Sequence, residues 1–356
     1  MRLILLVDMD YFFVACEELR RPGIKDKPVI VGADPKGGVG RGVVSTCNYV
    51  ARKYGIRSGM PISAAYRIKK DAIFLPVDYD YYERISQKVM DVVKGFADKF
   101  EQVSIDEAFA DVSARADGYD KALDIAKAIK SSIHERLGLP CSVGVGTNKL
   151  IAKMACEEAK PAGVKVVREE DAKEFLSKKP IRELYGVGKK MEEKLEVMGY
   201  ATIGELAKAN PMHLAEKLGV YGTDLYNYAN GKDDSEVEEN YEIKSIGRER
   251  TFETDTDDRA EIAKAIRAIS KDVSDEVAKG GFVFKVVTLK VRYSDFEEHM
   301  RSRSLSHRSN DADELASTAI SLFDAHAEKG GRIRKLGVRV SNLMKYGGQK
   351  RISEYA

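Results

Sequence analysis

The first 167 residues alternate short apolar runs with stretches whose apolar side chains recur at helical spacing. Residues 3–7 form a continuous apolar run that ends at Asp8, which predicts a buried strand with a carboxylate at its C-terminal end. A hairpin is predicted over 103–112, carrying Asp106 and Glu107. Further strands are predicted at 29–32, 43–46, 140–146 and 164–167, and helices at 64–70, 78–100, 119–137 and 148–159. This mixture predicts an α+β or α/β layer.

The pattern changes after residue 168. Residues 169–231 predict short helices punctuated by glycines, with Gly186-Val187-Gly188 before an amphipathic run. Residues 232–243 hold six acidic residues against one lysine, which predicts an extended tether that cannot bury itself. Beyond the tether, a strand, helix, strand, strand, helix, strand pattern predicts a small α+β domain; its clearest elements are strands at 282–293 and 332–340 and helices at 259–278 and 313–327.

Composition bounds the class of protein. The 356 residues are 43% apolar, which predicts two or more domains with real cores and excludes wholesale disorder. Four cysteines without a CxxC pair argue against a disulfide framework or a zinc site. The five apolar residues before Asp8 are too few for a signal peptide, and no apolar run approaches a membrane span. We therefore expect a cytoplasmic protein with no membrane partner.

The net charge of +2 hides a segregation along the chain. Residues 1–243 have 37 basic and 39 acidic residues, whereas 244–356 have 22 basic and 18 acidic, so the two parts carry −2 and +4. Much of the basic excess falls in predicted strands, at Arg301, Arg303, Arg332 and Arg334. Strand alternation places Arg332 and Arg334 on one sheet face, which predicts a surface that follows nucleic-acid phosphates. A solvated strand face is the alternative.

Three carboxylates are candidates for a metal site. Asp8 ends a buried strand, and Asp106-Glu107 lie in the predicted hairpin almost a hundred residues later. Hard oxygen ligands converging on one point would favour Mg²⁺, and two such ions could activate an attacking hydroxyl and stabilise a leaving pyrophosphate. The alternative is that they are solvated surface carboxylates.

Residues 45–53 predict a binding site for a triphosphate. In a helix over 47–54, Tyr49 and Arg52 would share a face, and Thr46 would lie near the helix N-terminus. An Arg fork, hydroxyl groups and a helix start can together bind phosphates. The chain has no GxxxxGK[ST] loop to compete for this role. Tyr and Arg on a helix can equally be plain surface residues.

Five motifs resemble those of the Y-family translesion DNA polymerases, in their DinB branch, in the same order and with the same spacing: VDMDYFF (7–13), STCNYVARKYGIRSGMP (45–61), SIDEAF (104–109), SVGVGTNKLIAKMA (142–155) and AKPAG (159–163). Residues 186–199 resemble that family's thumb helix-hairpin-helix, and 244–252 resemble the start of its little-finger domain. The resemblance therefore covers nearly the whole chain.

The resemblance implies an α+β, right-hand polymerase with a ferredoxin-like palm, small fingers, a helical thumb and a C-terminal α+β little finger. The implied boundaries are palm 1–11 and 77–167, fingers 12–76, thumb 168–231, linker 232–243, little finger 244–344 and tail 345–356.

The resemblance also implies roles for individual residues. Asp8 and Asp106 would bridge two Mg²⁺ ions, with Glu107 and the Met9 carbonyl as further ligands. The incoming triphosphate would be held by amides around Tyr11, Phe12 and Phe13 together with Thr46, Tyr49, Arg52 and Lys160. Phe13 occupies the steric-gate position, where an aromatic ring excludes a 2′-hydroxyl, and Ser45 and Gly59 would lie over the templating base. Asp10 is expected to be structural, and DNA contacts are expected at Gly186, Gly188, Lys189, Arg301, Arg303, Arg332 and Arg334.

The implied function is low-fidelity, template-directed DNA synthesis past damaged bases, by a monomer that binds primer-template DNA and a dNTP. At the C-terminus, Gln349, Ile352 and Tyr355 resemble a sliding-clamp-binding peptide that lacks its second aromatic residue. Two other functions stay open. A nucleotidyl cyclase-like palm enzyme would share carboxylates on a hairpin, and a non-catalytic DNA-binding scaffold would share the fold.

Overall fold

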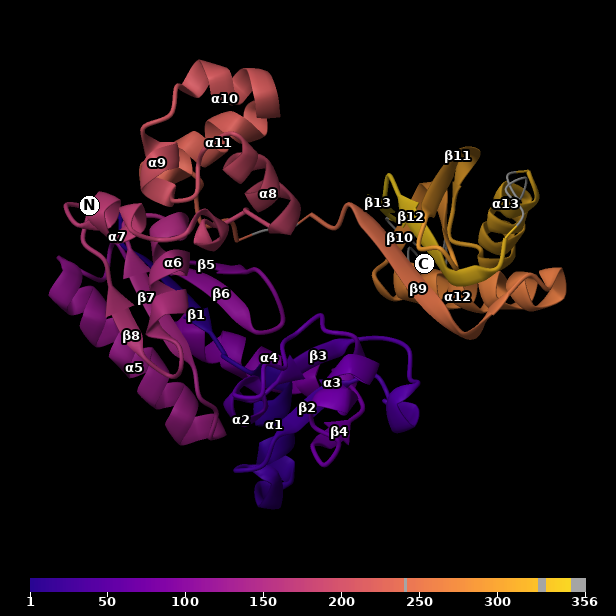
Figure 1. Ribbon diagram of the computed structural model, residues 1–356, viewed down its shortest axis with the longest axis horizontal. Helices are drawn as coiled ribbons and strands as arrows, with labels where there is room; N and C mark the ends of the chain where they lie inside the picture. The colour runs from indigo at the N-terminus through magenta and orange to yellow at the C-terminus, as the bar shows by residue number, and fades with distance from the viewer. Residues whose placement is uncertain (240–241, 326–330, 347–356) are drawn as a thin grey trace, which may run out of the picture. The chain divides into compact units, whose positions relative to one another are not determined.

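In the computed structural model, residues 1–239, 242–325 and 331–346 can be described. The chain divides into two compact units, residues 1–240 and 241–356, which are described separately below (Figure 1). The boundary between the units falls inside the acidic segment 232–243.

The centre of the first unit is a five-stranded sheet in the order β5-β6-β1-β7-β8. Its strands are β1 Ile4–Asp8, β5 Lys99–Gln102, β6 Glu107–Asp111, β7 Ser142–Gly146 and β8 Val164–Val166. Together with α4 (Tyr79–Phe96) and α5 (Tyr119–Leu137), the strands β1, β5, β6 and β7 follow a β-α-β-β-α-β order, with β1 paired antiparallel to both β6 and β7. The expected ferredoxin-like palm topology is confirmed.

Side-chain alternation along β1 decides what lies on each face of this sheet. Leu5 and Val7 belong to the core shared with α4 and α5, whereas Ile4 and Leu6 pack with Ala152 of α6 (Lys149–Ala159). The side chain of Asp8 follows the same alternation as Ile4 and Leu6, so it points to the α6 face. In β6, Glu107 and Phe109 point to the same face, because Asp8 and Glu107 are paired in register.

The segment between β1 and α4 has its own apolar cluster, but the buried side chains of its first helix, including Phe12 and Val14, belong to the core of the larger sheet. Its three-stranded sheet has the order β3-β2-β4, with β2 Val29–Gly32, β3 Val44–Cys47 and β4 Ile73–Leu75. The helices of this segment are α1 Phe12–Arg20, α2 Tyr49–Arg52 and α3 Ile62–Ile68. The helix expected over 47–54 is shorter than predicted because Asn48 caps it, its side chain accepting a hydrogen bond from the Ala51 amide at 3.0 Å.

Residues 169–231 fold as short helices around a third apolar cluster, as the glycine-punctuated pattern predicts. The α-helices are α7 Ala172–Ser177, α8 Lys189–Val197, α9 Ile203–Ala207, α10 Pro211–Leu218 and α11 Val220–Ala229. Before α8, Gly186 adopts a φ of 89°, a left-handed conformation that favours glycine, and the Tyr221 hydroxyl donates to its carbonyl.

The first half of the acidic segment 232–243 is not the free tether that its composition predicts. Val237 is only 4% exposed and packs with Ile4, Leu6 and Phe109 on the α6 face of the sheet. The Arg2 guanidinium donates to the Ser235 carbonyl at 2.9 Å, and the Leu150 amide donates to the Asp233 carboxylate at 3.0 Å. The prediction was wrong here because the basic partners and the apolar surface come from distant parts of the chain.

The second unit confirms the predicted strand, helix, strand, strand, helix, strand order. Its elements are β9 Ser245–Thr256, α12 Arg259–Lys279, β10 Phe282–Tyr293, β11 Glu298–Ser309, α13 Ala312–Asp324, β12 Ile333–Ser341 and β13 Met344–Lys345. The main sheet has the order β11-β10-β12-β9, and side chains from α12 and α13 complete its core.

The arginines that the sequence assigns to strands of this unit do not all lie on one face of the sheet in regular alternation. Arg301 and Arg303 stand opposite the buried Leu289 and Val287, so they lie on the helix-covered side of the edge strand β11. Arg303 donates from Nη1 to the Ser321 hydroxyl of α13 at 3.1 Å. A register shift between Ile333 and Lys335 interrupts the alternation that the sequence assigns to Arg332 and Arg334.

In the described ranges, none of the helices is both long and apolar enough to cross a membrane.

Candidate functional site

The ends of β1 and β6 bring Asp8 and Glu107 together. Asp8 is 3% exposed, and its Oδ1 accepts a hydrogen bond from the Asp10 amide at 2.7 Å. Burial, followed by a hydrogen bond with Glu107, raises the pKa of Asp8 to about 6, and the nearby Lys160 only partly offsets this. A carboxylate whose charge is this poorly solvated gains from a neighbouring cation.

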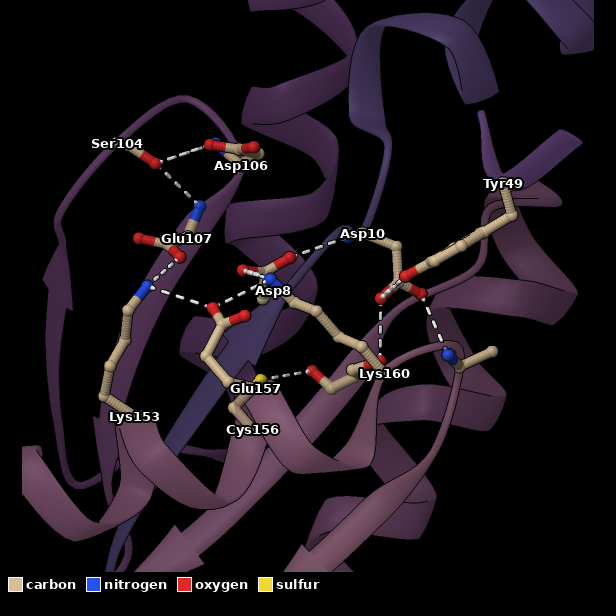
Figure 2. A network of polar contacts seen from close by, with 12 residues as sticks. Asp8, Asp10, Tyr49, Ser104, Asp106, Glu107, Lys153, Cys156, Glu157 and Lys160 are labelled. Carbon is tan, nitrogen blue, oxygen red and sulfur yellow. Dashed lines mark hydrogen bonds and ion pairs between the residues drawn. The ribbon is translucent and has the colours of Figure 1, made fainter. Parts of the chain in front are cut away.

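Helix α6 and the residue that follows it supply three charged groups to these carboxylates (Figure 2). Nζ of Lys160, the residue that follows the helix, lies 2.7 Å from Oδ2 of Asp8 and 2.9 Å from Oε1 of Glu157. Lys153 forms an ion pair with Glu107, and its Nζ lies 3.7 Å from Oε1 of Glu157. The structure therefore places Lys160 at the carboxylate cluster, where the sequence expects a phosphate-binding group.

Glu157 is the residue that the sequence analysis missed. One carboxylate oxygen from each of Asp8, Glu107 and Glu157 lies within 4.8 Å of the other two. The spacing of Lys153 and Glu157 was a usable signal, because residues four apart share a face of a helix. It was not decisive, because the sequence does not say which face of α6 meets the sheet.

Asp106 does not join this group. Its carboxylate accepts a hydrogen bond from the Ser104 hydroxyl at 2.6 Å, and Figure 2 shows it turned toward Ser104. Its backbone is nevertheless held at the site, since the Met9 amide donates to the Asp106 carbonyl at 3.0 Å. Asp106 is thus adjacent to the cluster through its main chain but not through its carboxylate.

The donor set fits a hard divalent cation. Asp8, Glu107 and Glu157 offer carboxylate oxygens, which Mg²⁺ prefers, and the Met9 carbonyl is adjacent in sequence. Two ammonium groups lie against the same carboxylates and balance most of their charge. Carboxylates that hold two ammonium groups have the negative charge that a metal ion requires of its ligands.

Asp10 ties the strand β1 to three other segments. Its Oδ1 accepts from the Ser142 hydroxyl at 2.8 Å and the Tyr49 hydroxyl at 3.4 Å, and its Oδ2 accepts from the Ala162 amide at 3.0 Å. Asp10 is 8% exposed, and burial raises its pKa. These contacts agree with a structural role for Asp10. The hydrogen bond from Ala162 also anchors the loop that carries Lys160.

The predicted triphosphate residues form a stack beside Asp10. The Arg52 guanidinium lies 4.8 Å from the Tyr49 ring centroid, and that ring meets Tyr11 edge-on at 5.5 Å. Tyr49 and Arg52 therefore share a helix face, as predicted. Thr46 lies in β3 rather than at the start of α2, and it is half-buried.

The two neighbouring phenylalanines lie in different surroundings. Phe12 begins α1, and its side chain is 2% exposed in the core, so only its backbone amide can take part in binding. Phe13 is half-buried and stacks on Tyr82, with ring centroids 4.5 Å apart and planes 15° from parallel. The Phe13 ring therefore has a fixed orientation.

The remaining predicted residues lie elsewhere on the two units. Ser45 is in β3, and Gly59, with a φ of 80°, donates its amide to the Val44 carbonyl of that strand at 2.9 Å. Gly188 caps α8, and Lys189 is the first residue of that helix. The clamp-like residues Gln349, Ile352 and Tyr355 lie outside the described residues.

Comparison with known proteins identifies the chain's relatives. Residues 7–157 match the impB/mucB/samB family, 169–200 match the IMS family HHH motif, and 243–353 match the impB/mucB/samB family C-terminal domain. DNA polymerase IV 2 of Methanosarcina mazei is 44% identical over 96% of this chain and 92% of its own length. DNA polymerase IV of Methanoculleus marisnigri is 42% identical over 96% of this chain and 94% of its own.

Solved structures of Y-family DNA polymerases are also similar to this chain. A chimera of the Y-family DNA polymerases Dbh and Dpo4 superposes with a TM-score of 0.88 at 29% identity, over 96% of this chain and 99% of the chimera. An insertion ternary complex of Dbh DNA polymerase has a TM-score of 0.67 at 28% identity, over 96% and 99% of the two chains. The chain belongs to the impB/mucB/samB family and is a Y-family translesion DNA polymerase of the DNA polymerase IV type.

Proposed function

We propose that this polymerase extends a primer on template DNA with dNTPs at the site formed by Asp8, Asp106 and Glu107. The observation that carries the proposal is the junction of β1, β6 and α6, where paired carboxylates at strand ends face two lysines. Two Mg²⁺ ions, when bound there, would supply Lewis acidity that activates the primer 3′-hydroxyl and stabilises the leaving pyrophosphate.

The chain's own residues would hold and orient the reactants. Asp8, Glu107 and the Met9 carbonyl would ligate the ions, and Asp106 would join them by turning its carboxylate away from Ser104. Arg52, Tyr49 and Lys160 would bind the triphosphate, helped by Thr46 and by the free amides at the start of α1, around Tyr11, Phe12 and Phe13.

Phe13 is proposed as the steric gate that excludes ribonucleotides, because Tyr82 fixes its ring by stacking. We expect Phe13→Ala to raise incorporation of ribonucleotides relative to deoxyribonucleotides by about tenfold or more, since a whole ring is removed from the pocket. Single-nucleotide insertion kinetics with matched rNTP and dNTP would measure this. Phe13→Tyr, which keeps the ring, should discriminate like the wild type, and unchanged discrimination in Phe13→Ala would disprove the assignment.

Low fidelity is proposed to follow from small residues near the templating base. Gly59 has no side chain, and an alanine Cβ at that position would meet nothing within 4 Å. Ser45 in β3 is equally short. With little bulk over the base, the shape of a distorted base pair is weakly checked, which suits synthesis past damage.

Primer-template DNA is proposed to contact both units. Gly186, Gly188 and Lys189 would offer backbone amides and charge at the start of α8, without reading bases. In the second unit, Arg301, Arg303, Arg332 and Arg334 would contact phosphates, those of β11 from the sheet edge beside α13. Action as a monomer and recruitment by a sliding clamp through Gln349, Ile352 and Tyr355 stay predictions.

Primer extension tests the proposed function directly. The full chain, with Mg²⁺, dNTPs and a primed template, should add the templated nucleotides, and Asp106→Ala should not. A cyclase-like enzyme would instead convert a nucleoside triphosphate without a primer, and a scaffold would bind DNA without extending it. Absence of templated extension by the wild type would refute the proposal.

A further inference from the structure

Lys153, Glu157 and Lys160 form a row of charged side chains along α6 and just beyond its C-terminal end. Glu157 is four residues after Lys153, so the two side chains share a face of α6, and Lys160 follows the C-terminal end of the helix. Oε1 of Glu157 lies 3.7 Å from Nζ of Lys153 and 2.9 Å from Nζ of Lys160. A single carboxylate therefore contacts both lysines.

Each lysine has a second partner in the sheet. Lys160 pairs with Asp8 at 2.7 Å, and Lys153 pairs with Glu107. The side chains of both lysines are 18% exposed, whereas that of Glu157 is 51% exposed. Glu157 is thus the partner nearer to solvent, and the sheet carboxylates are the partners nearer to the core.

The two lysines pair with the carboxylates that a divalent cation needs. An ammonium group and a divalent ion repel each other strongly at contact distance, so both cannot stay on the same carboxylate contacts. A partly buried ammonium group without any partner is costly, because its desolvation is then uncompensated. Glu157 lowers that cost, because it already contacts both lysines.

We propose that Glu157 is a positioning residue that stays paired with Lys153 and Lys160 when a divalent cation binds Asp8 and Glu107. Glu157 thereby favours cation binding. The inference rests on the proposed function, which assigns the cation to these carboxylates. When the cation takes the place of the lysines on Asp8 and Glu107, each ammonium group shifts toward Glu157, on the more exposed side of the cluster. A triphosphate has to arrive on that side. Glu157 therefore links metal binding to the presentation of Lys160.

Mn²⁺ binding to the full chain, without DNA or nucleotide, tests this inference. Free Mn²⁺ is followed by electron paramagnetic resonance, and thermal unfolding checks that each variant is folded. Glu157→Gln should raise the Kd for Mn²⁺ by about threefold to tenfold, the scale expected for losing two partly exposed ion pairs. Glu157→Asp should recover part of the affinity. Glu158→Gln is the matched control, because Glu158 pairs with Lys165 and Lys179 instead, and it should bind like the wild type.

A double-mutant comparison separates positioning from direct ligation. Lys153→Met removes a competitor and should lower the Kd. In the Lys153→Met, Lys160→Met background, the effect of Glu157→Gln should disappear, since no ammonium group is left to hold. An undiminished effect in that background would overturn the proposal and make Glu157 a ligand. Wild-type affinity in Glu157→Gln would also overturn it.

The proposed function fails in a different way. If Asp8→Asn binds Mn²⁺ as tightly as the wild type, or if the wild type does not extend primers, the metal assignment itself is wrong. If Asp8→Asn binds weakly and the wild type extends primers, but Glu157→Gln binds normally, only the role of Glu157 is refuted.

Discussion

Asp8→Asn is expected to lower the rate of templated extension by about 10³-fold, the upper range for losing one preorganised electrostatic group. Asn is nearly isosteric but carries no charge, so it cannot replace a carboxylate that holds a divalent cation. The Asp8 side chain lies at the point where β1, β6 and α6 meet, and its partner Lys160 would remain paired with Glu157. The loss should therefore reflect charge and not displacement of neighbours.

The same substitution is expected to stabilise the fold. The folded-state pKa of Asp8 is raised to about 6 from an ordinary value of 3.8, chiefly by burial. A raised pKa means that the folded state prefers the neutral form, so keeping Asp8 ionised near pH 7.5 opposes folding by roughly 3 kcal/mol, at about 1.4 kcal/mol per pH unit. Removing the charge should raise the unfolding temperature, which differential scanning calorimetry measures.

The pair of measurements distinguishes a functional from a structural carboxylate. Asp124→Asn is a matched control, because Asp124 is exposed on α5, which covers the opposite face of the sheet. It should change neither extension nor stability appreciably. An Asp8→Asn variant that keeps wild-type extension would remove Asp8 from the catalytic set, and one that loses activity together with stability would indicate a structural defect instead.

The sequence was most informative where one segment alone decides the structure. The continuous apolar run before Asp8 required a strand buried on both faces, and β1 is buried along its whole length. The strand end at Asp8 and a hairpin that carries Glu107 were both visible locally, but their pairing was not predicted, and the hairpin expected over 103–112 is formed by β5 and β6 with residues 103–106 between them. The order of elements in the second unit was equally readable, because its strands and helices are long and strongly patterned.

The sequence was least informative where partners come from distant segments. Glu157 enters the site only because α6 crosses the face of the sheet that carries Asp8. Val237 is buried because Ile4 and Leu6 offer an apolar surface more than two hundred residues earlier in the chain. The orientation of the Asp106 carboxylate depends on its hydrogen bond from the Ser104 hydroxyl, two residues earlier. The motif did not indicate that this hydrogen bond would turn the carboxylate away from Asp8 and Glu107.

Asp10→Ala is expected to destabilise the protein by about 3 kcal/mol, because it leaves buried donors without acceptors and places alanine in a strained backbone conformation. The Ser142 hydroxyl and the Ala162 amide would lose their partner. The φ of 58° at Asp10 is a left-handed value that Asp and Asn tolerate better than Ala. Asp10→Asn keeps that tolerance but has a single acceptor oxygen, so its stability should lie between those of the wild type and Asp10→Ala.

Asp10→Ala should also weaken nucleotide binding through the loop that precedes Ala162. Anchoring of the Ala162 amide places Lys160, and the Tyr49 hydroxyl is the third donor to the same carboxylate. A loss of about 1.4 kcal/mol of triphosphate binding corresponds to a tenfold higher KM for dNTP with a smaller change in kcat. Steady-state insertion kinetics below the unfolding temperature of the variant would measure this split.

Ser142→Ala is the control for this second effect. It removes one donor to Asp10 but leaves the contacts to Ala162 and Tyr49 in place, so it should lower stability without raising the KM for dNTP. An equal rise in KM for both variants would show that general loosening, and not the loop anchor, weakens nucleotide binding. An unchanged KM in Asp10→Ala would show that Lys160 does not depend on this loop, and Asp10 would then contribute to folding alone.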